Sequence, residues 1–386
     1  MSVFSSLIDQ SEVVNVLQEA VKSAHNKGDQ TQGMTHAWLF TGPPGSGRSN
    51  AAIAFAAALV CKNGGCSNCA DCMATITNSH ADVELIKTEG LSIKIDEIRE
   101  LISRASWAPS VAAWRVVVIE DADRLTDSAA NALLKVIEEP GLRTVWLLCA
   151  PTLTDVLPTI RSRCRHLSLR TPSTKAITKL LIERDSIDLA TAEFVAKASG
   201  GHIGRARRLA TDTNAKENRK NIMKLPFAIK DIASAYKAAQ YLVEAAKADA
   251  LADSEAKDEL EISKLKEAWG ASGSKLTAGG SKAVKELEKE QKSRSTRMVR
   301  DYLDRALLDL STLYRDVLLV QSGSNDSLIN EDLKSEISKL AATEGPPRTL
   351  KKIEAILKTR SNLAQNAAPL LLIEALMCEL RLKNGN

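Results

Sequence analysis

Apolar residues in the N-terminal part of the chain alternate between strand-like runs and helical spacing. Val116–Ile119 and Val145–Cys149 are short runs of β-branched or bulky apolar residues, typical of central strands covered on both faces. Ala37–Phe40 and Val83–Ile86 predict further strands, and the alanine-rich segment Ser49–Val60 predicts a buried helix. Because these strands alternate with helices, we predict an α/β domain with a parallel sheet and helices on both faces.

The pattern changes after Thr171-Pro172, where the β-branched runs end and helical spacing continues. Farther along, the Gly/Ser-rich segment Gly270–Ser281 predicts a mobile insert. It is flanked by the charged segments Asp253–Lys266 and Lys282–Arg300, which we interpret as solvated helix faces. We therefore expect three parts: an α/β domain at 1–172, short helices at 173–212, and an all-α domain at 213–386.

The composition excludes some classes of protein. At 386 residues the chain is long enough for two or three domains. Its net charge of +4 is too small to indicate nucleic-acid binding by itself, and 4% aromatic residues argue against a base-stacking surface. No apolar run reaches the length of a membrane span, and the N-terminus lacks the features of a signal peptide. We therefore expect a cytoplasmic protein.

A glycine-rich segment, Gly42–Ser49, follows the first predicted strand and opens the first buried helix. Gly42, Gly45 and Gly47 allow backbone N–H groups to close around phosphates at a helix N-terminus. Ser49 stands where a hydroxyl would hold Mg²⁺, and Arg48 occupies the usual lysine position, an exchange that is not conservative. A chance glycine-rich turn is the alternative, but the flanking strand and helix favour a phosphate-binding loop.

An acidic pair, Glu120-Asp121, comes directly after the strand Val116–Ile119. Downstream of a phosphate loop, such a pair is where Mg²⁺ is held and a water activated. The usual order is Asp then Glu, so the reversal here shortens the base by one methylene and misplaces an attacking water. Helix capping before Asp127 is the alternative function, and it is a stronger rival for Asp123 than for the pair itself.

Four cysteines lie close together at Cys61, Cys66, Cys69 and Cys72. Two tight Cys pairs can close on one ion, and four thiolates suit a tetrahedral zinc site. In a reducing compartment this clustering favours a metal over disulfides. An iron–sulfur cluster is the alternative. Because four thiolates leave no open coordination position, we predict structural zinc.

Arg163 lies in a Ser-Arg-Cys sequence after the predicted strand Val145–Cys149. Alone this motif is weak, and the arginine could be a plain surface cation. At the edge of a P-loop domain, however, an arginine can reach a neighbouring subunit's γ-phosphate and stabilise the transition state.

Together these motifs resemble the bacterial clamp-loader subunits of DNA polymerase III, an AAA+ family. The resemblance covers residues 1–210 well and the C-terminal helices more thinly. It is carried by the phosphate loop, the cysteine module and three further segments: His36–Phe40, Asn131–Pro140 and Ser162–Cys164. It implies a part of the polymerase holoenzyme that acts in DNA replication and belongs to the cytoplasmic replisome. The zinc ligands and the arginine finger of the family map onto the four clustered cysteines and Arg163.

The resemblance also implies partners. By this resemblance, residues 1–172 are a nucleotide-binding-type AAA+ domain, 173–212 a helical lid, and 213–386 a helical collar. Family members form a five-subunit ring through the collar, together with gamma/tau motor subunits and a delta subunit. The ring opens the sliding clamp and loads it on primed DNA. Contact of this chain with DNA is expected through the whole ring and without sequence preference.

The chain departs from the motor subunits of this family at several ATPase positions. Ala150 replaces the polar residue that ends the fourth strand, and Gly204 replaces the sensing arginine of the lid. Arg48 and the reversed Glu120-Asp121 add to these changes, whereas Arg163 is kept. We therefore expect an assembly subunit whose own ATPase activity is weak or absent, with binding of ATP and Mg²⁺ left open.

Two other functions remain as alternatives. One is a competent motor ATPase of the gamma/tau type. The other is a zinc-dependent DNA-binding module, which ranks low because the cysteines lie inside the ATPase-type domain without a basic recognition helix.

Overall fold

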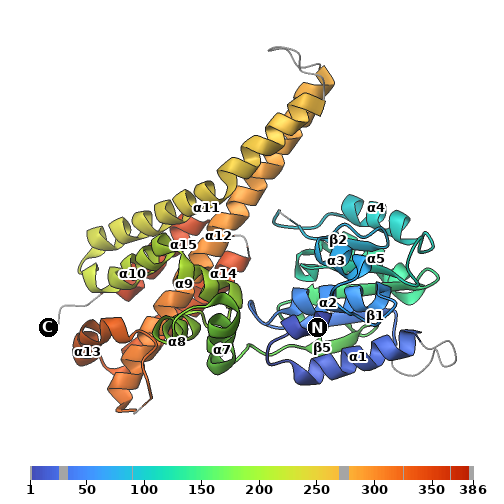
Figure 1. Cartoon of the computed structure of the whole chain (residues 1–386). Coiled ribbons are helices and arrows are strands. Elements are labelled where there is room, and N and C mark those ends of the chain that lie inside the picture. Colours follow the sequence, from blue (N-terminus) through green and yellow to red (C-terminus); the bar gives the residue numbers. More distant parts are fainter. Residues whose placement is uncertain are drawn as a thin grey trace. The chain divides into compact units, whose positions relative to one another are not determined.

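The computed structural model of the chain describes residues 2–25, 34–88, 90–268, 278–324, 326–365 and 367–381. They form two compact units, Met1–Arg207 and Arg208–Asn386 (Figure 1). The first unit holds a parallel sheet with helices, and the second is helical. The sequence predicts three parts, with boundaries at 172 and 212, whereas this division has two. The two predicted boundaries stay predictions.

A five-stranded parallel sheet forms the centre of the first unit, in the order β2-β3-β4-β1-β5. Its strands are β1 Ala37–Thr41, β2 Val83–Ile86, β3 Arg115–Ile119, β4 Thr144–Ala150 and β5 Arg165–Ser168. The four predicted strands are confirmed. The sequence did not predict β5, because this edge strand is short and its Arg165 and His166 are polar.

Both faces of the sheet are covered, which explains the continuous apolar runs. Val116 and Val118 pack with α2 (Arg48–Val60) on one face, whereas Val117 and Ile119 pack with α5 (Asp127–Glu138) on the other. Helix α1 (Ser11–His25) joins the first layer and α4 (Ile95–Ala105) the second. The predicted α/β architecture is therefore confirmed.

Shorter helices complete the first unit. They are η1 Val3–Ser6, α3 Ala70–Ile76, η2 Ala122–Arg124, η3 Leu153–Asp155, α6 Pro158–Arg161, α7 Thr174–Asp185, α8 Leu189–Ala198 and α9 Ile203–Thr211, the last of which crosses the unit boundary. Side-chain caps start α7 and α8: Ser173 Oγ accepts from the Ala176 amide, and Asp188 Oδ1 accepts from the Thr191 amide.

Every element described in the second unit is helical, as predicted. The helices are α10 Thr213–Ala228, α11 Ile232–Ala268, α12 Ala278–Ser322, η4 Glu331–Leu333, α13 Lys334–Thr343, α14 Pro346–Ala364 and α15 Pro369–Leu380. Of the predicted insert Gly270–Ser281, residues 270–277 lie outside the described residues, and the rest belongs to α12. Among the described helices, none combines the length and apolarity needed to cross a bilayer.

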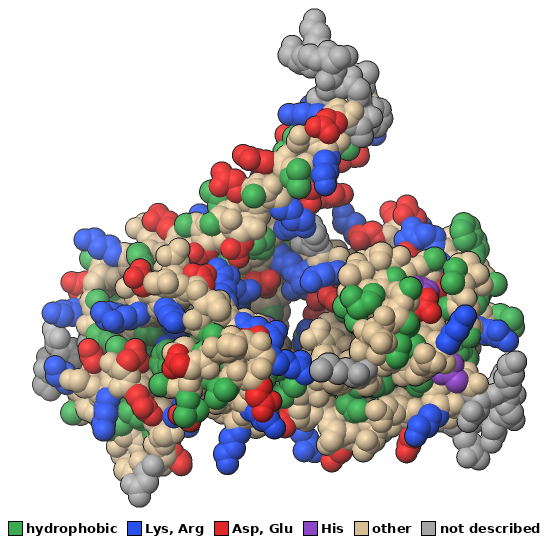
Figure 2. Space-filling view, viewed as in Figure 1, with side chains coloured by type: hydrophobic (Ala, Val, Ile, Leu, Met, Phe, Trp, Pro, Cys, Tyr) green, Lys and Arg blue, Asp and Glu red, His purple; other side chains and the backbone are tan. Residues whose placement is uncertain are grey.

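The charged segments of α11 and α12 belong to two long helices that run side by side (Figure 1). Lysine and arginine side chains are interleaved with acidic ones along them (Figure 2). Arg294 of α12 pairs with Asp258 and Glu261 of α11, and its side chain is mostly buried. These charges are therefore partly solvated, as predicted, and partly the polar seam between the two helices.

A buried ion pair links three helical segments of the second unit. Arg219 Nε lies 2.9 Å from Asp309 Oδ1, and each side chain is only 6% exposed. Asn330 accepts a second hydrogen bond from Arg219 and donates one to Asp316. Because both charges are removed from water, the pair contributes to stability only while it is complete.

Replacing Arg219 with methionine is therefore expected to lower the free energy of unfolding by about 3–5 kcal/mol, since Asp309 would remain buried without its cation. Urea denaturation of the purified chain measures this loss. Lys220→Met on the same helix is the control, because Lys220 is exposed. Equal stability of the two variants would contradict the assigned role of the buried pair.

Candidate functional site

The phosphate-loop segment connects the end of β1 to the start of α2. Gly45 has φ +91° and Gly47, the N-cap of α2, has φ +85°, so both positions favour glycine. The Gly42 amide donates to Pro151 O over 3.1 Å. Within the described chain, no acceptor is present for the amides of Gly45, Gly47 and Arg48. The backbone therefore has the conformation of an anion-binding loop at a helix N-terminus.

Arg48 turns its cation back toward its own loop. Its Nη1 donates to Gly42 O over 2.7 Å, and the side chain is half-buried. The charge of Arg48 also reaches Asp123, where it acts to lower the carboxyl pKa. The guanidinium of Arg48, at the usual lysine position, therefore already interacts with groups of the protein itself.

The acidic residues after β3 do not act as a simple pair. Glu120 Oε2 lies 3.7 Å from Lys87 Nζ, whereas Asp121 is buried. Burial raises the pKa of Asp123, the neighbouring charge of Asp121 raises it further, and Arg124 and Arg48 oppose the change. Asp123 Oδ1 is buried without a hydrogen-bond partner among the described residues.

The capping interpretation of Asp123 is wrong. Helix α5 is capped by Thr126, whose Oγ1 accepts from the Ala129 amide over 3.3 Å, and Asp123 lies inside η2. Asp123 is therefore a third acidic candidate beside Glu120 and Asp121. The sequence feature that could have indicated this candidate is an acidic residue two positions after Glu120-Asp121.

The two positions that match nucleotide-sensing residues of the motor subunits in the resemblance carry no polar side chain in this chain. Ala150 is fully buried at the end of β4, in register with Thr41 of β1. Gly204 lies in the first turn of α9, so this helix has no arginine at this place. Arg205, the next residue, donates its amide to His202 Nδ1 over 3.2 Å.

The four clustered cysteines converge on one point. All four Sγ atoms lie within 4.8 Å of one another, and Cys61 Sγ is 3.7 Å from Cys66 Sγ and 3.6 Å from Cys69 Sγ. In a tetrahedral site with zinc–sulfur bonds of about 2.3 Å, the sulfurs would lie about 3.8 Å apart. The cluster can therefore hold a metal ion.

Local backbone geometry supports a thiolate at one member of this cluster, Cys66. The amides of Asn68 and Cys69 donate to Cys66 and lower the pKa of its thiol to about 6. The Cys72 amide donates to Cys69 Sγ over 3.4 Å, because Cys69 is the N-cap of α3. Gly65 (φ +99°) packs against Val3, so the turn between the first two cysteines is fixed by the N-terminal segment.

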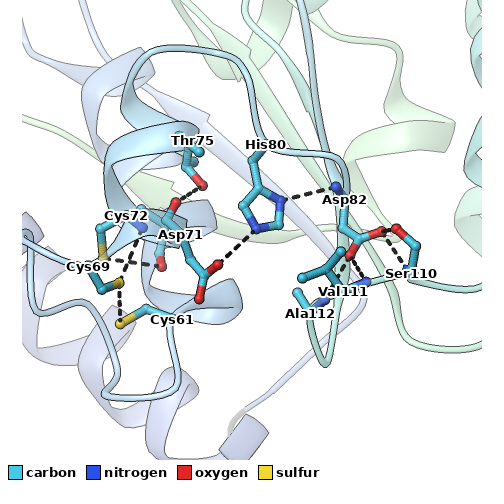
Figure 3. A network of polar contacts seen from close by, with 12 residues as sticks. Cys61, Cys69, Asp71, Cys72, Thr75, His80, Asp82, Ser110, Val111 and Ala112 are labelled. Atoms are coloured by element: carbon cyan, nitrogen blue, oxygen red, sulfur yellow. Dashed lines mark hydrogen bonds and ion pairs between the residues drawn. The ribbon is translucent and has the colours of Figure 1, made fainter.

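A chain of polar contacts connects the cysteine module with a distant loop (Figure 3). Asp71 of α3 lies 3.6 Å from His80 Nε2, and His80 Nδ1 accepts from the Asp82 amide over 3.0 Å. The Asp82 carboxylate then accepts from the amides of Ser110, Val111 and Ala112 at 2.7–2.8 Å and from the Ser110 hydroxyl at 2.9 Å. The loop before β3 is thereby tied to the segment that follows the module.

Replacing Asp82 with asparagine is expected to destabilise this loop by about 2–3 kcal/mol, because one amide oxygen replaces a carboxylate with four donors. Burial opposes ionisation, but the donor amides lower the pKa of Asp82 from 3.8 to about 2. The stability that it contributes is therefore complete above about pH 4 and lost as the pH falls toward 2.

Thermal unfolding at several pH values measures the Asp82 effect. The difference between wild type and Asp82→Asn should shrink as the pH falls through this range. Asp96→Asn is the control, since the Asp96 side chain is 85% exposed. A difference that persists undiminished at low pH would contradict the account.

Arg163 lies at the surface just after α6. Its Nε donates to Glu138 Oε1 over 2.6 Å and its Nη1 to Thr159 O over 2.8 Å. The side chain is 39% exposed, and Glu138, at the end of α5, is 46% exposed. The guanidinium is therefore oriented by these contacts yet accessible.

Comparison with known proteins decides the family. Models described as DNA polymerase III, delta subunit, and DNA polymerase III, delta subunit, C terminal, match residues 10–173 and 300–381. The delta' subunit of DNA polymerase III from Bacillus subtilis is 29% identical, over 95% of this chain and 97% of its own length. The chain belongs to the delta-prime family of clamp-loader subunits. The delta' subunit of Pseudomonas aeruginosa is a further relative, 33% identical over 45% of this chain and 55% of its own.

The motor-type relatives are matched only in part. The gamma/tau subunit of Mycobacterium tuberculosis is 30% identical over 51% of this chain, which spans 35% of the length of that relative. A gamma subunit-related protein and a RuvB mutant of Thermotoga maritima resemble the fold at TM-scores of 0.40, with 17% and 19% identity. They cover 95% and 57% of this chain, and 98% and 65% of their own chains. The chain's own sheet and phosphate loop are those of an AAA+ P-loop domain, the predicted fold class.

Proposed function

We propose that this delta-prime family member is mainly an assembly subunit of the clamp loader and that Arg163 serves the ATP site of a neighbouring motor subunit. The observation that carries this function is the contrast between two sites. Arg163 is oriented and accessible, whereas the chain's own nucleotide site lacks polar side chains at Ala150 and Gly204. An arginine supplied in trans stabilises charge that develops on the transferred phosphoryl group.

The chain's own site fits a nucleotide better than it fits catalysis. Gly42, Gly45, Gly47 and Ser49 supply the phosphate loop, and the buried oxygen of Asp123 is free to accept a hydrogen bond. ATP would bring phosphates that accept hydrogen bonds from the amides of Gly45 and Gly47, and Glu120 and Asp121 would hold its Mg²⁺. Turnover would be slow, because Glu120 is paired with Lys87 and Arg48 with Gly42 O.

We propose zinc as the metal of the cysteine cluster, with Cys61, Cys66, Cys69 and Cys72 as its ligands. Four sulfurs within 4.8 Å of one another, with two of the distances at 3.6–3.7 Å, support this identity, and four thiolate ligands leave no position for a substrate. The role is therefore structural.

We propose that the complex is a hetero-pentamer with gamma/tau motor subunits and a delta subunit, and that it loads the sliding clamp on primed DNA. The second unit would supply the collar. A competent motor ATPase is not favoured, because the relative matched over nearly the whole chain is a delta' subunit and the gamma/tau relatives are matched over about half of it.

Reconstitution tests this proposal. Mixing the purified chain with gamma/tau and delta subunits should give one complex that contains it, measured by native mass spectrometry. Arg163→Ala should assemble equally well, because its contacts lie within the first unit. Failure of the wild-type chain to enter any complex would contradict the proposed assembly role.

A further inference from the structure

The segment just before α9 reaches the phosphate loop. Gly201 has φ +89°, and a Cβ there would lie 1.8 Å from Thr171 Cγ2 and 3.4 Å from Pro172 O. Its backbone is thus in close contact with the segment that follows β5. This contact fixes the position of the next residue, His202.

His202 packs directly on Gly45 of the phosphate loop. A Cβ at Gly45 would lie 2.6 Å from His202 Cα, 2.7 Å from its Cβ and 2.9 Å from its Cγ. Only a glycine allows this approach without displacing backbone. The lid segment and the phosphate loop are therefore in contact at one residue on each side.

The imidazole of His202 also occupies space beside Gly204. A Cβ at Gly204 would lie 3.3 Å from His202 Cε1 and 3.5 Å from Nδ1. The Arg205 amide donates to His202 Nδ1, which fixes the orientation of the ring. Because Gly204 has no side chain, the ring can lie within close contact of the place where a side chain at this position would begin.

We propose that His202 is a latch that holds the lid segment closed on the phosphate loop and so lowers the affinity of this chain for nucleotide. This inference rests on the proposed phosphate-binding function of the loop. Nucleotide binding requires the closed contact to open, so the apparent affinity is reduced by the fraction of open molecules. Arg48 also lowers the nucleotide affinity, because its guanidinium donates a hydrogen bond to Gly42 O instead of to a phosphate.

Removing the ring tests the latch. His202→Ala should tighten binding of a fluorescent ADP analogue with Mg²⁺ by about tenfold or more, as expected if the open state is populated at about 10% or less. His25→Ala, on α1, is the matched control and should bind as wild type does. Hydrogen exchange should also speed up at residues 199–207 in His202→Ala, and circular dichroism checks that each variant is folded.

A second variant approaches the latch from the other side. Gly204→Leu places a Cβ 3.3 Å from the ring, so the ring has to shift by at least a few tenths of an ångström, and the variant adds no cation that could itself bind phosphate. Nucleotide affinity should again rise. Unchanged affinity in both folded variants would overturn the latch, as would tight binding by the wild-type chain. The action of Arg163 on the motor ATPase is measured separately, so failure of the latch and failure of the proposed function are distinguishable.

Discussion

Arg163→Ala is expected to abolish most ATP hydrolysis at the adjacent motor site and with it most clamp loading by the reconstituted complex. Arginine fingers contribute on the order of 10³–10⁵ in rate, so the affected site should slow by at least about a thousandfold. The guanidinium is held by Glu138 and Thr159 O, and 39% of the side chain is accessible to a neighbour. Single-turnover ATP hydrolysis by the assembled complex measures the loss.

Arg161→Ala is the matched control for this experiment. Arg161 ends α6 two residues before Arg163, and no hydrogen bond or ion pair of its side chain is present among the described residues. Its loss should leave hydrolysis within about twofold of wild type, since surface charges contribute little. Equal rates of ATP hydrolysis in complexes with Arg163→Ala and Arg161→Ala would contradict the proposed action of Arg163 on the neighbouring subunit.

Loss of the proposed metal should destabilise the first unit. Cys72→Ser removes a fully buried member of the proposed ligand set, so the variant should lose the zinc proposed for this site and at least about 3 kcal/mol of folding free energy. For a unit of this size, that corresponds to a drop in Tm of about 6–12 °C. Metal analysis and thermal unfolding measure both effects.

The same experiment discriminates between metals. Cys378→Ser, in α15, is the control and should keep both the metal and the Tm, because Cys378 is outside the cluster. Iron with visible absorbance in the wild-type protein would favour an iron–sulfur cluster. A full equivalent of zinc in Cys72→Ser, with unchanged Tm, would contradict the proposed ligand set.

Local patterns made much of the fold predictable. Val116–Ile119 is apolar at every position because β3 is covered on both faces, and this pattern is visible in the sequence. The cysteine cluster was predictable for a related reason. Its four members lie within twelve residues, so a turn and one short helix bring them together.

Contacts between distant segments were not predictable in this way. His202 can contact Gly45 because Gly45 has no Cβ, and such a close approach of backbone segments leaves no pattern of residue types in the sequence. The sequence allowed Asp123 to be interpreted as a helix cap. In the structure, Asp123 lies inside η2, the short helix that follows β3. Asp82 has four donors from residues 28–30 positions away, which no local spacing indicates.

Steady-state ATP hydrolysis by the purified chain, compared with its Arg48→Ala variant, tests most directly whether this subunit works without its own ATPase. The site with Ala150, Gly204 and a paired Arg48 should hydrolyse ATP at the background rate, and Arg48→Ala should change nothing. Hydrolysis well above background that Arg48→Ala abolishes would contradict the account and identify a motor ATPase instead.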